Sequence, residues 1–324
     1  MKLPRARRLL PILFWFAAAS LHAQQAYPVK PVHLVVSYAP GNVTDLLARI
    51  IADSLAEKWK QPVLVENRPG QGGSLGAQIG AKSPPDGYTL LFSAMAAFGI
   101  NPHVYPNVGY DVKKDFSPII GVAYPSSVMI ASLGVKANTL QELIAYSKAH
   151  AGELNYGTAG SGTVPHLNME ALKALTGLKA EHVPYKAAMA VTTDLVGGRI
   201  QLQQETVSVV LPQIKANRVK AIIAMSTRRL TQLPNLPAIT EVLPAFEPII
   251  PWLGILAPAG TPADIIEKVN RDVDAILRQG AVIEKLQFNG LSPIGGSARD
   301  FGVLVNRDVE RLGKLVRSLN LKVD

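Results

Sequence analysis

Two glycine-containing loops, each followed by a segment with helical periodicity, carry the chemistry most visible in this sequence. The first contains Gly41, the second contains Gly160 and Gly162, and neither includes a cationic side chain. A loop that leads into a helix N-terminus presents unpaired backbone N–H groups at the positive end of the helix dipole, and this favours anions. Thr44 and Thr163 are the expected N-caps, with hydroxyls that could also face a ligand. An ordinary turn between a strand and a helix would look the same at either loop alone.

Three ionisable side chains near these loops each allow two roles. His166 lies in the first turn of the second helix, where it could contact a ligand carboxylate or act as a capping or packing residue. Asp45 could stabilise the start of the first helix or pair with a ligand amine. Glu205 follows the polar stretch 201–204 and could line a cleft or face solvent.

Enzyme motifs do not fit the glycine-rich segments. The segment 160–162 lacks the G-x-S-x-G spacing of a nucleophile elbow, and Pro165 stands where a dinucleotide fingerprint needs its third glycine. The run 70–74 has no lysine for a phosphate loop. The six histidines lack metal-ligand spacing, and the chain has no cysteine. We therefore predict a protein that is not an enzyme, with no catalytic residues, no metal and no cofactor.

The elements that must hold these loops repeat along the chain. Apolar runs at 32–36 and 63–65 flank a stretch of helical spacing that ends at Trp59, and the order strand, glycine loop, helix, strand recurs over 154–185. Such alternation predicts parallel sheets covered by helices, and hence two α/β lobes. Ligands of open α/β sheets sit at the carboxyl ends of the strands, so the site is expected in the cleft between the lobes.

The last third of the chain is expected to return to the first lobe. An apolar strand at 252–257 precedes two amphipathic helices at about 261–277 and 299–319. Two crossings between the lobes then make a two-stranded hinge. The predicted division is a leader at 1–23, a first lobe at 24–125 plus 245–324, and a second lobe at 126–244.

The N-terminus has the pattern of a secretory signal peptide. Basic residues from Lys2 to Arg8 precede the apolar run 9–21, and small residues follow up to Ala23, the expected cleavage point. A membrane anchor is the alternative, but the run is shorter than the roughly 20 apolar residues of a spanning helix. Removing the four basic leader residues lowers the net charge from +9 to +5. The remaining basic residues are scattered, which argues against nucleic-acid binding. We expect a periplasmic protein that diffuses freely.

The chain resembles the Bug-type substrate-binding proteins of tripartite tricarboxylate transporters over essentially its whole mature length. The matching segments are Tyr27-Pro28-Val29-Lys30-Pro31, Ala39-Pro40-Gly41-Asn42-Val43-Thr44-Asp45, Val65-Glu66-Asn67-Arg68-Pro69-Gly70, Pro85-Asp86-Gly87-Tyr88-Thr89-Leu90, Leu154-Asn155-Tyr156-Gly157, Gly162-Thr163 with His166, His182-Val183-Pro184-Tyr185-Lys186, Leu211-Pro212-Gln213-Ile214-Lys215 and Ala257-Pro258-Ala259-Gly260-Thr261-Pro262.

The resemblance implies a two-lobed, type II periplasmic-binding-protein fold with the ligand cleft between the lobes. It implies that the loops 40–44 and 158–163 hold a carboxylate, the first partly through waters. Family ligands are di- and tricarboxylates, acidic amino acids and aromatic acids, bound for uptake or sensing. Two integral membrane subunits are the usual partners, although many members lack a dedicated transporter, and the protein is expected to be a monomer. The predicted ligand-binding residues are Tyr38, Pro40, Gly41, Asn42, Val43, Thr44, Ser93, Thr158, Ala159, Ser161, Gly162, Thr163, His166 and Glu205.

Three departures from the family pattern fall at or near the inferred cleft. Asn42 and Ala187 stand where the family usually has glycines, and Gln204-Glu205 stands where an aromatic–Asp pair is common. These departures bear on the ligand and not on the fold. Two other functions share the architecture. An effector-sensing domain would need a DNA-binding helical domain where this chain has its leader, and a hydrolase would need a nucleophile paired with a base.

Overall fold

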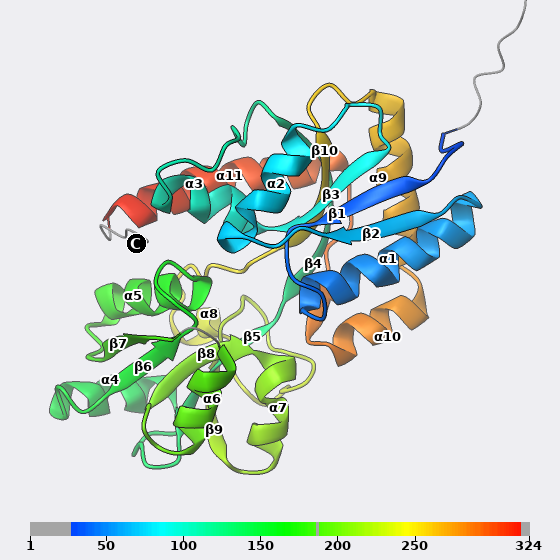
Figure 1. The fold of residues 1–324 in the computed structure, drawn as a ribbon. Coiled ribbons are helices and arrows are strands. Elements are labelled where there is room, and N and C mark those ends of the chain that lie inside the picture. The colour runs from blue at the N-terminus through cyan, green and yellow to red at the C-terminus, as the bar shows by residue number, and fades with distance from the viewer. Residues whose placement is uncertain (1–26, 186–187, 319–324) are drawn as a thin grey trace, which may run out of the picture.

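Two separate β-sheets, each flanked by helices, make up the protein (Figure 1). The computed structural model describes residues 27–185 and 188–318. The predicted leader at 1–23 and the departure at Ala187 lie outside the described residues. Within the described ranges, no helix combines the length and apolarity that crossing a membrane requires.

The larger sheet has six strands in the order β11-β4-β10-β3-β1-β2, and the smaller has five in the order β7-β6-β8-β5-β9. The strands are β1 (Val32–Val36), β2 (Val63–Asn67), β3 (Thr89–Ala94), β4 (Phe116–Pro125), β5 (Ser127–Ser132), β6 (Asn155–Thr158), β7 (Glu181–Pro184), β8 (Leu202–Thr206), β9 (Val219–Ala224), β10 (Leu253–Pro258) and β11 (Leu291–Pro293). The helices are α1 (Val43–Trp59), the 3-10 turn η1 (Gln71–Gly73), α2 (Ser74–Ala81), the π-turn η2 (Ala96–Ile100), α3 (Asn101–Val104), α4 (Leu140–Ala149), α5 (Val164–Thr176), α6 (Ala188–Val196), α7 (Val207–Lys215), α8 (Ile239–Val242), α9 (Ala263–Leu277), α10 (Gly280–Phe288) and α11 (Ala298–Ser318).

The expectation of purely parallel sheets is wrong, because each sheet is mixed. β1 pairs in parallel with β2 and β3, but β10 is antiparallel to β3 and β4. In the smaller sheet β6 is parallel to β7 and β8, whereas β5 is antiparallel to β8 and β9. The exceptions have one cause. The chain crosses between the sheets twice, around Ser126 and through the segment 244–250, and we call these the crossing segments. β5 follows the first and β10 follows the second. Both strands therefore run away from the other sheet, while their neighbours run toward it.

This topology places the carboxyl ends of the remaining strands at the edges where the sheets face each other, with the exception of β11, which is antiparallel to β4 and starts beside its end. Ser127, which starts β5 at the crossing, pairs with Thr206, which ends β8. β10 likewise starts beside the end of β3, since Leu253 pairs with Ala94. The predicted repeat is confirmed at the level of elements, because β1-α1-β2 and β6-α5-β7 follow the same order.

Both faces of the larger sheet are buried. Alternate residues of β1 separate the two cores, with Leu34 packing toward α1, α9 and α10 and Val35 packing toward α2, η2 and α11. Figure 1 shows the red α11 and the orange α9 and α10 lying against the sheet that the blue N-terminal strands begin. The prediction that the last third returns to the first sheet is therefore confirmed. The periodicity of α11 explains this packing, because Phe301, Val305 and Leu312 form one buried stripe.

Two helix ends carry local sequence signals: Thr139 and Glu142 have the spacing of a capping box, and Gly177 is the expected stop of the helix that follows Thr163. Thr139 accepts a hydrogen bond from the Glu142 amide (3.2 Å), as a capping box requires, but the Glu142 carboxylate binds the amide of Asn138 (2.7 Å) and not that of Thr139. Gly177 ends α5 in a left-handed conformation (φ 70°), as predicted. The sequence did not predict β4, α6, α7 or β8.

Hydrogen bonds join the crossing segments to elements beside both sheets. The amide of Ser126 donates to Gly290, and the Ser126 carbonyl accepts from Val207. On the returning segment, the side chain of Asn168 in α5 accepts from the Ile249 amide (2.8 Å) and donates to the Ile249 carbonyl (3.1 Å). Asn168 is fully buried, so this two-point bond replaces hydration that its amide has lost. It joins α5 to the returning segment.

Candidate functional site

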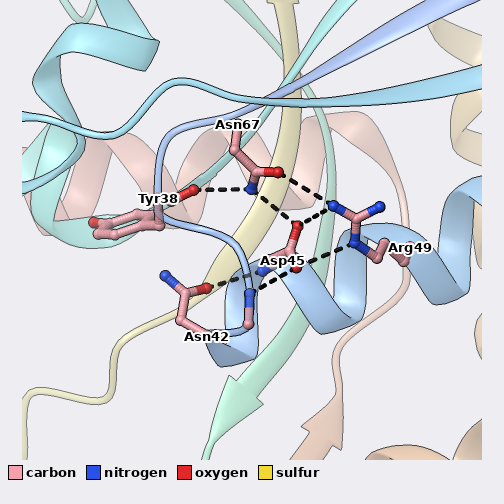
Figure 2. A network of polar contacts seen from close by, with 6 residues as sticks. Tyr38, Asn42, Asp45, Arg49 and Asn67 are labelled. Atoms are coloured by element: carbon pink, nitrogen blue, oxygen red, sulfur yellow. Dashed lines mark hydrogen bonds and ion pairs between the residues drawn. The ribbon is translucent and has the colours of Figure 1, made fainter.

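The loop between β1 and α1 is held by a polar network around its glycine (Figure 2). The Asn42 side chain accepts from the Asp45 amide at 2.9 Å and is the N-cap of α1. The expectation that Thr44 caps this helix is wrong. Asn42 has the extended backbone that an N-cap adopts, whereas Thr44 already lies inside the first turn.

The carboxylate of Asp45 organises this network. It accepts from the amide of Gly41 (2.9 Å), the side-chain amide of Asn67 (2.9 Å) and the guanidinium of Arg49 (3.1 Å). Burial alone would raise the pKa of Asp45, but these donors and the charge of Arg49 hold the pKa below its usual value. The interpretation of Asp45 as a residue that stabilises the helix start is confirmed. Its oxygens are already engaged, which leaves little capacity for a ligand amine.

Asn67 and Arg49 are residues of this site that the sequence analysis did not single out. Asn67, at the end of β2, donates to the backbone carbonyl of Tyr38 (2.9 Å) and accepts from Arg49 (3.2 Å). It therefore joins the end of β2 to both ends of the loop (Figure 2). The i, i+4 spacing of Asp45 and Arg49 was a detectable signal of their ion pair. Nothing in the sequence pattern indicated the bonds of Asn67.

A third glycine loop, η1 before α2, lies against the first one. The Tyr38 hydroxyl donates to the carbonyl of Gly72 (3.0 Å), and the Asn101 side chain donates to the carbonyls of Gln71 and Gly72 (both 3.0 Å). A β-carbon at Gly73 would lie 2.9 Å from the Tyr38 hydroxyl oxygen, and its φ is +99°. Only glycine fits there, because it tolerates both the close contact and the left-handed backbone.

In the second lobe, the loop between β6 and α5 has a matching construction. The amide of Gly162 donates to Nδ1 of His166 at 3.0 Å. The hydroxyls of Thr158 (2.8 Å) and Thr163 (2.9 Å) both donate to the carbonyl of Gly160. Thr163 is the N-cap residue by position, as predicted, but its hydroxyl turns back to the loop and makes no capping bond.

Two stacked histidines pack against this loop. The rings of His166 and His182 lie 3.9 Å apart at 12°, and the ring of Tyr156 also stacks with His182, at 4.9 Å. Nε2 of His182 is 2.7 Å from the Thr158 hydroxyl oxygen. For His166, the capping and packing role considered from sequence is confirmed. His182 is a supporting residue that the sequence analysis quoted only as part of a motif.

Both histidines are held neutral. Burial lowers the pKa of His166, and burial together with the neighbouring His166 lowers the pKa of His182 to about 4. A neutral His166 is required for the observed geometry, because Nδ1 can accept the Gly162 amide only when it carries no proton. The loop geometry and the protonation state of the pair therefore depend on each other.

The two loops share one hydrogen-bonding arrangement. In each, the amide of the glycine before the N-cap donates to the side chain four residues later, Asp45 in one lobe and His166 in the other. The amides of Gly41 and Gly162 are therefore engaged within their own loops in this structure. The first-turn amides with no partner within the described residues are those of Val43 and Thr44 in α1 and of Val164 and His166 in α5, and these can bind an anion.

The predicted site residues differ in exposure. Pro40, Gly41, Ala159 and Ser161 are exposed, Tyr38, Asn42, Val43, Thr163 and Glu205 are half-buried, and Thr44, Ser93, Thr158, Gly162 and His166 are buried. Glu205 is the penultimate residue of β8, where its carboxylate accepts from the Thr206 amide (2.7 Å) and from Gln203 (3.4 Å), and burial raises its pKa. The hydroxyl of Ser93 is fully buried and has no partner within the described residues.

The part of the chain that the structure describes holds no group of three or more histidine, aspartate or glutamate residues placed to bind a metal ion. The loops after β1 and β6 and the end of β8 instead carry backbone amides, hydroxyls and one carboxylate. Such an arrangement can orient and neutralise a small anion by hydrogen bonding.

Comparison with known proteins places this chain among carboxylate-transport receptors. The profile of the tripartite tricarboxylate transporter family receptor matches residues 47–321. The protein BugT of Bordetella pertussis (strain Tohama I) is 31% identical over 322 residues, which cover 98% of each chain. An R. palustris protein solved with adipate is 32% identical with a TM-score of 0.79, covering 91% of this chain and 99% of its own.

A second solved structure, MatC from Rhodopseudomonas palustris with bound malate, is 28% identical with a TM-score of 0.74 and covers 90% of this chain and 100% of its own. The family and these neighbours are periplasmic binding proteins with a two-lobed α/β fold, and the order of elements described above matches that fold. The chain belongs to the tripartite tricarboxylate transporter receptor family, in its Bug-type branch of solute-binding proteins.

Proposed function

We propose that this protein captures a small carboxylate between its two lobes in the periplasm and delivers it for uptake or sensing. The observation that carries the proposal is the matched pair of loops, each tied to its own helix start by a glycine amide and a side chain four residues later. Adipate and malate, bound by two neighbours, have the chemistry that such helix starts favour.

The ligand contacts follow from this construction. A carboxylate would bind the free first-turn amides of α1 and α5, with Asn42 and Thr163 at the loop rims. The remaining predicted contacts from Tyr38 to Glu205 would surround it. No cationic side chain is present in either loop, so specificity would depend on backbone geometry and neutral donors. Glu205, whose raised pKa favours the protonated form, could donate a hydrogen bond to one ligand oxygen.

Closure of the lobes is the proposed conformational change. The lobes would be 24–125 with 245–324, and 126–244, joined at the two crossing segments. Hinge closure around a ligand is an established arrangement for two-domain binding proteins. A ligand that contacts both lobes stabilises the closed state by the free energy of the contacts made only there.

The remaining parts of the proposal concern context. Residues 1–23 would direct export and then be removed, leaving a soluble monomer in the periplasm. Two integral membrane subunits would receive the ligand, as the family name suggests. We propose no catalytic activity, because the Thr158 hydroxyl, which lies beside His182, is buried and donates its proton to the carbonyl of Gly160.

One experiment tests the capture of a carboxylate. Protein purified from the periplasm would be denatured, and the small molecules released would be identified by mass spectrometry. Adipate, malate and the compound found would then be titrated by calorimetry, with the diamide of adipic acid as the uncharged control. We expect saturable binding of at least one carboxylate, no binding of the diamide, and a smaller radius of gyration with ligand. Binding of the diamide as tightly as adipate would refute the anion site.

A further inference from the structure

A large cavity lies beside the two crossing segments, away from the loops described above. Its volume is about 790 Å³, which is within the usual range for small-molecule sites. Its walls come from the end of β4, the returning segment 244–250, the loop after β9 and one side of α11. None of the residues predicted to bind the carboxylate lines it. The cavity is therefore a separate place where a ligand would touch both lobes and the hinge.

Arginines dominate the charge of this cavity. The four that line it are Arg228, Arg229, Arg307 and Arg311. Three of them are held in place by carboxylates, in the pairs Arg229–Glu241 (2.8 Å), Arg307–Asp308 (3.1 Å) and Arg311–Glu247 (3.5 Å). Arg228 is exposed and makes no ion pair or side-chain hydrogen bond within the described residues. The cavity thus carries one cation that its own carboxylates do not neutralise.

Arg307 has donor capacity left after its ion pair. Asp308 engages its Nε and Nη2 atoms, and a guanidinium has five N–H donors. The other oxygen of the buried Asp308 accepts from the indole Nε1 of Trp252 at 3.1 Å. A change at Arg307 is therefore transmitted to the indole of Trp252 through one carboxylate.

We propose that this cavity binds a small doubly charged anion, a phosphate or a dicarboxylate, between Arg228 of one lobe and Arg307 of the other. Guanidinium groups bind both anions through paired, charge-assisted hydrogen bonds. The walls belong to both lobes and to both crossing segments. An anion bound here therefore also shifts the equilibrium between the open and closed arrangements of the lobes.

The two tryptophans of the mature chain give a test with an internal reference. Trp59 also donates its indole N–H to a buried carboxylate, that of Asp272 at 2.7 Å, but it lies at the end of α1 and does not line the cavity. The full mature protein would be titrated with inorganic phosphate, and separately with succinate, at constant ionic strength, while the two indole N–H resonances are followed by NMR. We expect a saturable shift of the Trp252 resonance and a stationary Trp59 resonance.

Matched variants locate the response. Arg228→Gln removes the unpaired cation in the loop after β9, and Arg218→Gln removes an exposed arginine immediately before β9. We expect Arg228→Gln to weaken anion binding at least about tenfold, the effect of one lost charge-assisted contact, and Arg218→Gln to leave it unchanged. A shift with phosphate only, or with succinate only, supports the site and identifies the anion. Equal shifts of both indoles, no saturable shift, or a shift that Arg228→Gln does not alter would overturn the proposal; the last result would assign the response to the carboxylate cleft.

Discussion

The amide of Gly162 donates to Nδ1 of His166 at 3.0 Å, just as the amide of Gly41 donates to the carboxylate of Asp45 at 2.9 Å. The acceptor in one lobe is neutral, and the acceptor in the other is an anion. The same loop geometry is therefore stabilised in two chemically different ways. The two loops should respond differently to substitution and to pH.

Replacing His166 by alanine should weaken carboxylate binding several-fold. The Gly162 amide would lose its acceptor, and an unsatisfied buried donor costs about 1–3 kcal/mol. His166→Asn, whose side-chain oxygen can accept the same bond, should recover part of the affinity. Calorimetric titration of both variants checks this. His150→Ala, an exposed histidine at the end of α4, is the control, and a loss as large in this variant would contradict the explanation.

Acid should loosen the second-lobe loop before the first. Both stacked histidines have folded pKa values below the value of about 6.5 expected in the unfolded chain. The unfolded state therefore binds more protons between these values, so this stability is complete above about pH 6.5 and declines as the pH falls. For His182 the decline continues to about pH 4. Melting temperature and ligand affinity measured from pH 7 to pH 4 should fall together, and His182→Gln should flatten both curves.

Substituting Asp45 should destabilise the protein more than substituting a neighbour on the same helix. Asp45→Asn removes the charge that Arg49 faces and one of the acceptor oxygens, in a side chain that is 4% exposed. Breaking such a buried network costs about 2 kcal/mol or more. Asp53→Asn, two turns later on α1 and exposed, should change little. Urea unfolding of the two variants decides the matter, and equal free energies of unfolding would contradict the role given to Asp45.

Substituting Asn42 can separate an effect on the stability of the protein from an effect on carboxylate binding. Asn42→Asp keeps an N-cap that accepts from the Asp45 amide, so the melting temperature should stay close to that of the wild type. It also removes the side-chain donor and adds a negative charge at the rim of the site. We expect carboxylate affinity to fall at least about tenfold, which is about 1.4 kcal/mol. Asn138→Asp, an exposed residue before α4, serves as the control.

The apolar elements were predictable because their periodicity determines which face is buried. The strand β1 and the helices α1, α9 and α11 follow such patterns, and their positions agree with the structure within one or two residues. The strand β8 was missed because Gln203 and Gln204 are polar but buried. Gln203 bonds Thr192 in the preceding helix, 11 residues earlier, and Gln204 bonds Ser127, 77 residues earlier. No local pattern contains that information.

Within the site, sequence located the loops but not the bonds inside them. Three residues in a row, Asn42, Val43 and Thr44, begin the first helix, and the choice of cap depends on a backbone angle that sequence does not specify. The side-chain acceptors of the glycine amides were also hidden. Asp45 and His166 were each assigned two roles, and only the folded geometry shows that both serve as acceptors for their own loops.

The two-point bond between Asn168 and Ile249 has a consequence for how the family could diversify. It attaches α5, and with it the loop 158–163, to the crossing segment 244–250, about which the lobes would turn. The distance between this loop and the hinge axis then stays constant, whatever the sequence of the loop. Exchanging loop residues between relatives should transfer ligand preference without changing the geometry of lobe closure. Recognition and mechanics would thus be separable modules that evolution, or a sensor designer, could alter one at a time.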